Sequence, residues 1–138
     1  MTSQLNVDTI VDKAGSGGTN VKVANTSTYV SDGGNVTQNT VQGLGKAWFR
    51  ASSDTTLLVS FNISSGTDNG TGDYSYALSN AFTGVNEYSA IYNAYTTVSR
   101  IAIRNSGRDS ASVIATEIFD GSTNSDHSHN GAVHGDLA

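Results

Sequence analysis

Three histidines stand close together near the end of the chain, and their type and spacing suit a metal site. His127 and His129 form a His-x-His pair, and His134 follows in the same region. Two imidazoles on one face of a strand can ligate a transition metal ion. Serine, asparagine and glycine surround these residues, which is typical of a solvated loop between strands. We therefore expect a loop here, with no bound metal and no cofactor.

Acidic residues in the middle of the chain offer two other chemistries. Asp68, Asn69 and Asp73 resemble part of a calcium loop, but no carboxylate stands where an EF-hand loop needs its bidentate acid. A hairpin turn capped by Asx side chains is the better interpretation. Carboxylate pairs for glycan cleavage and Ser-His-Asp sets can be drawn almost anywhere in a chain so rich in serine. We therefore expect no catalytic residues and a non-enzymatic protein.

Three tyrosines suggest a binding chemistry. Tyr88, Tyr92 and Tyr95 carry flat rings on which a sugar could stack. Their spacing is explained equally well by packing in a core or at a subunit interface, and packing is the prediction.

Three arginines alternate with isoleucines in the following segment. Arg100, Arg104 and Arg108 are predicted to form a charged outer face. Cross-strand pairing with Glu87 or Glu117 would hold their guanidinium groups in place.

A turn between two alternating runs indicates the elements that position these groups. Apolar and polar residues alternate over 57–64 and again over 74–79, and Asn69-Gly70 lies between the two runs. Period-two alternation on both sides of Asn-Gly is a strong hairpin pattern, since both residues tolerate positive φ. The sequence therefore predicts antiparallel β-structure, with Gly70 at a positive φ.

The same region carries a family resemblance. The segments Lys46–Arg50, Ser60–Ser65 and Thr67–Tyr74 resemble a module common in virion proteins of tailed phages that infect marine bacteria. The opening Leu5–Asp12 and the closing Val133–Ala138 are similar to the ends of the same proteins. The central motif is fairly specific as a family marker, although fibres, spikes and head appendages all reuse such modules.

The resemblance implies a structural role in a virion. It suggests a homotrimeric appendage of the tail-fibre type that attaches to the host, assembled in the host cytoplasm. An N-terminal arm would dock on other virion proteins, and a host surface glycan is a further candidate partner. A capsid decoration or head-fibre protein and a carbohydrate-binding module are the alternatives.

Composition limits the other function classes. Hydrophobic residues make up 36 % of the chain and charged residues 14 %, with a net charge of −5 and no cysteine. So few cations argue against a nucleic-acid partner. No apolar run approaches the ~18 residues that a membrane span needs, so we expect no membrane insertion. We also expect no secretory signal, because the first residues are neither basic nor apolar.

Strand-like segments recur from Lys46 onward, separated by Gly, Asn, Asp and Ser clusters. Such regular spacing predicts an all-β fold, an antiparallel β-sandwich of about seven strands. We expect an extended N-terminal arm over 1–45 and the sandwich over 46–138. The expected strands are 46–52, 57–64, 73–80, 87–96, 98–105, 111–120 and 131–137.

Two sets of apolar residues follow from the alternation of these strands. The first set is the expected core: Trp48, Val59, Phe61, Ile63, Tyr74, Tyr76, Leu78, Tyr88, Ile101, Ile103, Val113, Ala115, Phe119 and Val133. A second apolar stripe on the opposite faces would pack against a partner, because large exposed apolar surfaces mark interfaces. Together with apolar residues of the arm, it gives the predicted oligomer or docking interface: Leu5, Val7, Ile10, Ile91, Tyr95, Ile114 and Ile118.

Overall fold

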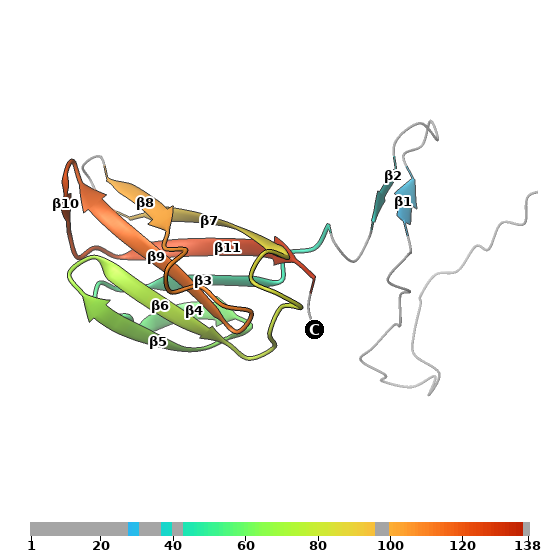
Figure 1. Cartoon of the computed structure of the whole chain (residues 1–138), viewed down its shortest axis with the longest axis horizontal. Helices are drawn as coiled ribbons and strands as arrows, with labels where there is room; N and C mark the ends of the chain where they lie inside the picture. The colour runs from blue at the N-terminus through green and yellow to red at the C-terminus, as the bar shows by residue number, and fades with distance from the viewer. Residues whose placement is uncertain (1–27, 31–36, 40–42, 96–99, 137–138) are drawn as a thin grey trace, which may run out of the picture. The chain divides into compact units, whose positions relative to one another are not determined.

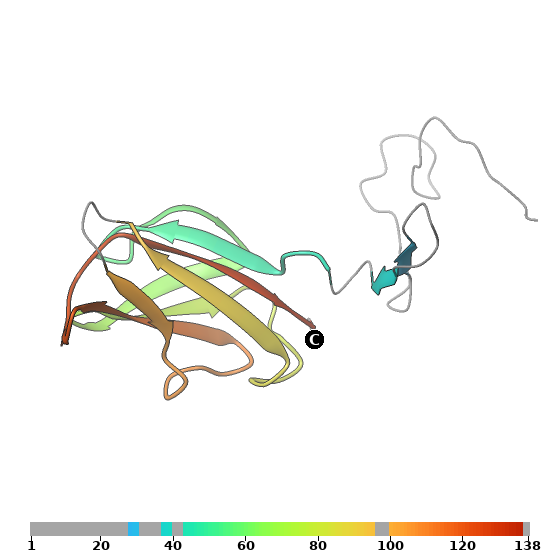
Figure 2. The same ribbon diagram turned by 90° about the horizontal axis from the view of Figure 1, so that it is seen from above.

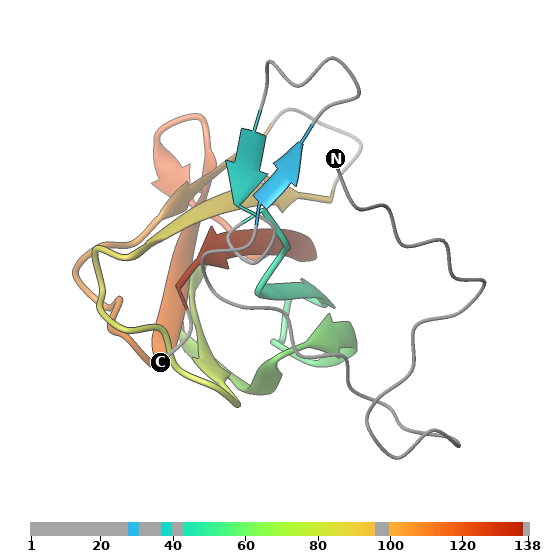
Figure 3. The ribbon, with the colours of Figure 1, turned by 90° about the vertical axis from the view of Figure 1, so that its right-hand side faces the viewer.

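A computed structural model describes four ranges of the 138-residue chain (Figure 1). These ranges are 28–30, 37–39, 43–95 and 100–136. The chain divides into two units, residues 1–41 and 42–138. In the first unit, β1 (Thr28–Val30) and β2 (Thr37–Asn39) pair antiparallel and lie side by side (Figure 3). The extended arm over 1–45 stays a prediction.

The second unit is all-β, and no helix able to cross a bilayer is present among the described residues. Its strands are β3 (Ala47–Ala51), β4 (Leu57–Phe61), β5 (Ile63–Gly70), β6 (Asp73–Leu78), β7 (Tyr88–Ala94), β8 (Ile101–Arg104), β9 (Val113–Asp120), β10 (Thr123–Asn124) and β11 (His129–Gly135). Each of the seven predicted ranges overlaps a strand. β10 and most of β5 were not predicted, because their Gly, Asn, Asp and Ser residues are typical of turns.

The strands form two antiparallel sheets that pack as layers (Figure 2). One sheet has four strands in the order β4-β3-β11-β7. The other has five, in the order β10-β9-β6-β5 with β8 also paired to β9. The predicted antiparallel β-sandwich is thereby confirmed.

The core lies between the sheets and follows the alternation best in β6. Along Asp73–Leu78 half-buried and buried residues alternate strictly, so Tyr74, Tyr76 and Leu78 all point inward. The core consists of Ala47, Phe49, Ala51, Ile63, Tyr74, Tyr76, Leu78, Phe82, Tyr88, Ile114, Ile118 and Val133. Ring contacts such as Phe49 on Tyr76, with centroids 4.0 Å apart, join the two layers.

The prediction of one continuous strand over 57–64 is wrong, because the chain changes sheets in the middle of it. β4 belongs to the four-stranded sheet and β5 to the five-stranded sheet. Asn62, between them, has φ 59° and so turns the chain sharply. Its side chain amide donates to the carbonyls of Lys46 (3.1 Å) and Asn80 (3.0 Å), and its oxygen accepts from the Asn80 amide (2.7 Å). Asparagine is among the few side chains that tolerate this conformation.

A β-bulge in β4 places some of the residues predicted for the core on the outer face of the sheet. Arg50 pairs with Val59 and Ala51 with Leu57, so Leu58 is an extra residue in β4. Val59 therefore shares the outer face with Arg50 instead of pointing inward with Leu57. Several residues predicted for the core are exposed for this and similar reasons of register: Trp48, Val59, Phe61, Ile101 and Ile103. Val113 and Phe119 are half-buried, whereas the remaining predicted core residues are buried.

The predicted hairpin around Asn69-Gly70 is present, but its first strand is β5 and not the predicted strand over 57–64. β5 and β6 pair from Ile63 to Gly70, and Thr71-Gly72 forms the connection. Gly70 has φ 132°, which confirms its predicted positive φ, and Gly72 has φ 66°. Asp68 accepts a hydrogen bond from the Gly70 amide at 2.9 Å, as an Asx-capped turn requires.

Candidate functional site

The outward face of the four-stranded sheet carries an unbroken row of apolar residues. Phe61 pairs with Trp48, Trp48 with Ala132 and Ala132 with Ile91, so one residue from each strand enters the row. Phe61 is 52 %, Trp48 43 % and Ile91 69 % exposed. Exposed apolar surface of this kind marks a binding or assembly surface more often than a solvated one.

Aromatic rings dominate one end of this row. The rings of Trp48 and Phe61 lie 6.5 Å apart between centroids, with planes only 21° from parallel. Across the sheet from Phe61, the Arg50 guanidinium stacks over the ring of Tyr95, which follows β7, at 4.7 Å, a cation–π contact. These contacts hold exposed side chains in fixed orientations.

A polar row runs beside the apolar row on the same face. Arg50 pairs with Asn130, and Asn130 pairs with Asn93 on β7. Among the described residues, no hydrogen bond reaches the side chain amides of Asn130 and Asn93, and no carboxylate pairs with Arg50. The sequences of β3, β4, β7 and β11 contain no aspartate or glutamate. The face therefore combines aromatic rings with amide and guanidinium groups.

The structure separates the residues predicted for a subunit or docking interface. Ile91 and Tyr95 are exposed, 69 % and 62 %, on or next to β7. Ile114 and Ile118 are fully buried in the core, so their predicted position on an outward stripe is wrong. They point inward because β9 faces the opposite way from the predicted register, which placed Val113 and Phe119 in the core. The remaining predicted interface residues, Leu5, Val7 and Ile10, lie outside the described residues.

The three histidines do not form one site. His129 is fully buried, so the prediction of a solvated loop is wrong for this residue. Its Nδ1 contacts the carbonyl of His127 at 2.8 Å, and its Nε2 lies 2.5 Å from the Tyr76 hydroxyl. Arg100 donates to Nε2 of His127 at 3.0 Å. No group of three or more His, Cys, Asp or Glu residues in the described part of the chain could hold a metal ion.

The arginines predicted for an outer face pair with different acids from those expected. Arg100 bridges to Asp120 (2.8 Å) and Arg108 to Asp73 (2.7 Å). Arg104 pairs with the buried carboxylate of Asp109.

Two tyrosines lie inside the sandwich. Tyr88 is buried, and burial together with nearby Asp109 raises the pKa of its hydroxyl to about 12. The Tyr92 hydroxyl is buried, and no residue that the structure describes forms a hydrogen bond with it. Core packing, as predicted, explains both rings, whereas Tyr95 is exposed and its ring stacks with Arg50.

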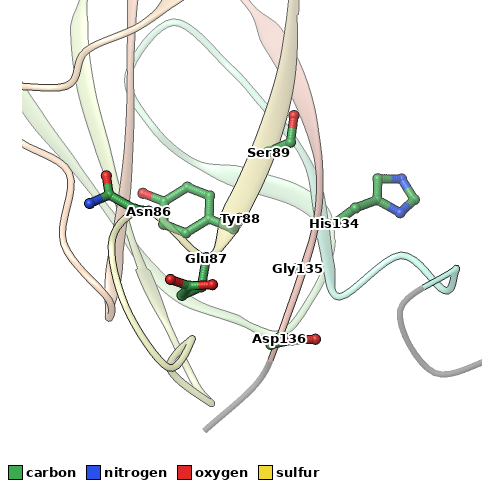
Figure 4. Close-up of a pocket in the computed structure, with 7 residues that line it drawn as sticks. All are labelled: Asn86, Glu87, Tyr88, Ser89, His134, Gly135 and Asp136. Atoms are coloured by element: carbon green, nitrogen blue, oxygen red, sulfur yellow. The ribbon is translucent and has the colours of Figure 1, made fainter. Parts of the chain in front are cut away.

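A shallow pocket of 460 Å³ lies where β7 begins and β11 ends (Figure 4). Glu87, Tyr88, His134 and Asp136 contribute to its lining. The imidazole of His134 points away from the Glu87 carboxylate (Figure 4), so these two groups are not arranged as an acid–base pair. The pocket offers polar surface without a nucleophile held by a base.

Sequence reasoning missed the exposed aromatic pair, because Trp48 and Phe61 were assigned to the core. Arg50 was the available clue, since residues two apart in a strand share a face. A charged Arg50 on the face of Trp48 argues that Phe49 points inward instead.

The arrangement on the four-stranded sheet is suited to binding rather than to bond-breaking chemistry. Rings and hydrogen-bonding groups converge there, while Arg100, Arg104 and Arg108 are used in ion pairs of the fold. Comparison with known proteins adds no assignment: the chain matches no family model, no curated protein and no solved structure.

Proposed function

We propose that this chain is a non-enzymatic structural protein of a phage virion, a trimeric appendage of the tail-fibre type that serves in host attachment. The observation that carries the proposal is the likeness of Lys46–Arg50, Ser60–Ser65 and Thr67–Tyr74 to a module of such virion proteins. An antiparallel β-sandwich is a fold that suits such a module.

Several residues of the segments that resemble the virion module lie at turns of the chain. Asn62 turns the chain from one sheet to the other, and Gly70 and Gly72 shape the β5–β6 turn. A motif made of such residues specifies a backbone rather than a reactive site. This supports a structural role, in which the chain contributes a folded domain and catalyses no reaction.

The exposed face of the four-stranded sheet supports assembly. Ile91 and Tyr95 keep their predicted role as subunit contacts, because both are exposed beside the apolar row. A small sandwich with a core this lean gains stability when a partner covers such surface. The arm over 1–45 would dock the trimer on other virion proteins.

The experiment is to disrupt purified particles of the encoding phage, separate heads from tails, and probe both fractions for this chain. The proposal expects the chain in the tail fraction. Recovery with heads would favour the alternative of a capsid decoration or head-fibre protein. Absence from both fractions would contradict a virion role and favour a free carbohydrate-binding module.

A further inference from the structure

We propose that Asn69-Gly70 is a site of spontaneous covalent modification, at which the Gly70 amide attacks the Asn69 side chain and Asp68 takes up the amide proton. The inference is independent of the proposed virion role, because it rests on the chemistry of the β5–β6 turn. The chain has two Asn-Gly pairs, Asn69-Gly70 and Asn130-Gly131, and they lie in different surroundings.

The reaction is a deamidation, and water is its only co-reactant. The Gly70 nitrogen forms a bond to Cγ of Asn69, the Cγ–Nδ2 bond breaks, and the nitrogen that leaves takes up the proton lost by Gly70 and departs as ammonia. Water then opens the resulting succinimide at either carbonyl, which gives aspartate or isoaspartate at position 69. Glycine favours the ring closure because it has no side chain to obstruct the attack.

The attacking group lies next to a base. The Gly70 N–H donates to Oδ1 of Asp68 at 2.9 Å. A general base must lie within hydrogen-bond reach of the proton that it removes, and this carboxylate does. Nδ2 of Asn69 lies 2.8 Å from the Ser75 hydroxyl, so a group that can donate a proton stands beside the nitrogen that leaves.

The backbone of the turn leaves room for the ring. The pairing of β5 with β6 shifts register between Asp68 and Gly70, so Asn69 is an extra residue of a bulge. Gly70 is exposed, and a Cβ there would meet nothing within 4 Å. The turn lies at one end of the sandwich (Figure 1), where water reaches it.

Asn130-Gly131 provides an internal control. This pair lies in β11, which pairs with β3 on one side and with β7 on the other. Gly131 is buried, and a Cβ there would lie 2.6 Å from the Phe49 ring. Because ring closure would pull β11 away from its neighbours, we expect Asn130 to react only when the domain opens.

Peptide mapping by mass spectrometry of the full chain, incubated at neutral pH with and without urea, tests the site. In buffer, Asn69 should convert at least about tenfold faster than Asn130 and yield both aspartate and isoaspartate. In urea the two should convert at similar rates, because the local sequence alone then sets the rate. Equal rates in buffer, or conversion of Asn69 in urea only, would overturn the proposal.

Asp68→Asn tests the base. An amide oxygen can still accept from the Gly70 N–H, so this variant keeps the hydrogen bond of the turn and loses only the carboxylate. Conversion of Asn69 should slow by about tenfold or more. Glu87→Gln, which removes an exposed acid outside this turn, is the matched control and should leave the rate unchanged. An unchanged rate in Asp68→Asn, or an equal loss in both variants, would contradict the role given to Asp68.

Discussion

His129 links the two sheets by a polar contact inside an apolar core. Its Nδ1–H donates to the His127 carbonyl, which can only accept, so in the neutral ring Nε2 accepts from the Tyr76 hydroxyl on β6. The ring of Tyr74 stacks on it at 4.4 Å, and Phe49 meets it edge-on. Burial lowers the pKa of His129 below its ordinary value, because the charged imidazolium would lose its hydration. The fold therefore selects the neutral form.

The free energy of unfolding should decrease as the pH falls below about 6.5, the ordinary histidine pKa. There the unfolded chain binds a proton that folded His129 excludes, so the stability present above that pH is progressively lost. Urea denaturation between pH 8 and 5.5 measures this slope. His129→Phe should flatten it and His134→Gln, at an exposed site, should not. If the free energy of unfolding of His129→Phe depended on pH as that of the unchanged protein does, another titratable group would be responsible for the pH dependence.

Glycines of the β5–β6 turn should differ in their tolerance of a side chain. Gly70→Val should cost about 1–3 kcal/mol of stability through backbone strain alone, since a Cβ there meets nothing within 4 Å. Gly72→Val should cost more, because its Cβ would lie 2.6 Å from the Ile118 carbonyl and 2.7 Å from the Ser125 amide nitrogen. Thr71→Ser should change little. Thermal melting of the three variants checks the order, and similar melting temperatures would mean that neither glycine is required.

At the scale of the elements, the sandwich depends on one crossing of the chain between sheets. Asn62 lies between β4 and β5, and its side-chain amide group forms hydrogen bonds with the backbone of Lys46 and of Asn80. A positive φ and three backbone hydrogen bonds at one residue make this corner specific for asparagine.

Two substitutions should separate the contributions of the Asn62 backbone and side chain. Asn62→Ala should lose on the order of 2–4 kcal/mol, because alanine disfavours this φ and leaves the bonded groups unpaired. Asn62→Gly should lose less, since glycine keeps the conformation and removes only the hydrogen bonds. Denaturant unfolding of both variants measures the difference. Equal losses would show that the backbone conformation contributes little.

The alternation of residues predicted which segments are strands better than which side of each strand is buried. In β6 nothing interrupts the period of two, and Tyr74, Tyr76 and Leu78 point inward as expected. In β4 the bulge at Leu58 moves Val59 and Phe61 to the outer face, and a bulge leaves no mark in the alternation itself. The split at Asn62 was equally hidden, because the residues around it alternate as one strand would.

The candidate site was predictable only in part, for the same reason. Ile91 and Tyr95 were predicted to face outward, and they do. Trp48 and Phe61 were placed in the core, because large aromatic residues are usually buried. Only tertiary pairing sets Trp48 beside Phe61 and Arg50 beside Asn130, and such pairing is not encoded by local pattern.

At the scale of the whole molecule, the proposed assembly is a trimer. The full chain should elute as a monodisperse species of three times the 14.3 kDa monomer mass in light scattering. Ile91→Asp should shift it toward the monomer, because a charge would be buried against a partner subunit, while Ile103→Asp on the other sheet should not. A stable monomer at every concentration would contradict the proposed trimer.

The central claim is that this chain is a structural part of a virion, and counting its copies in intact particles tests it most directly. Quantitative mass spectrometry of purified particles, calibrated against a capsid protein, gives the number of chains per particle. The account predicts a fixed copy number that is a multiple of three, constant between preparations and retained through density-gradient purification. Absence of the chain from particles, or a copy number that falls with each purification step, would contradict it.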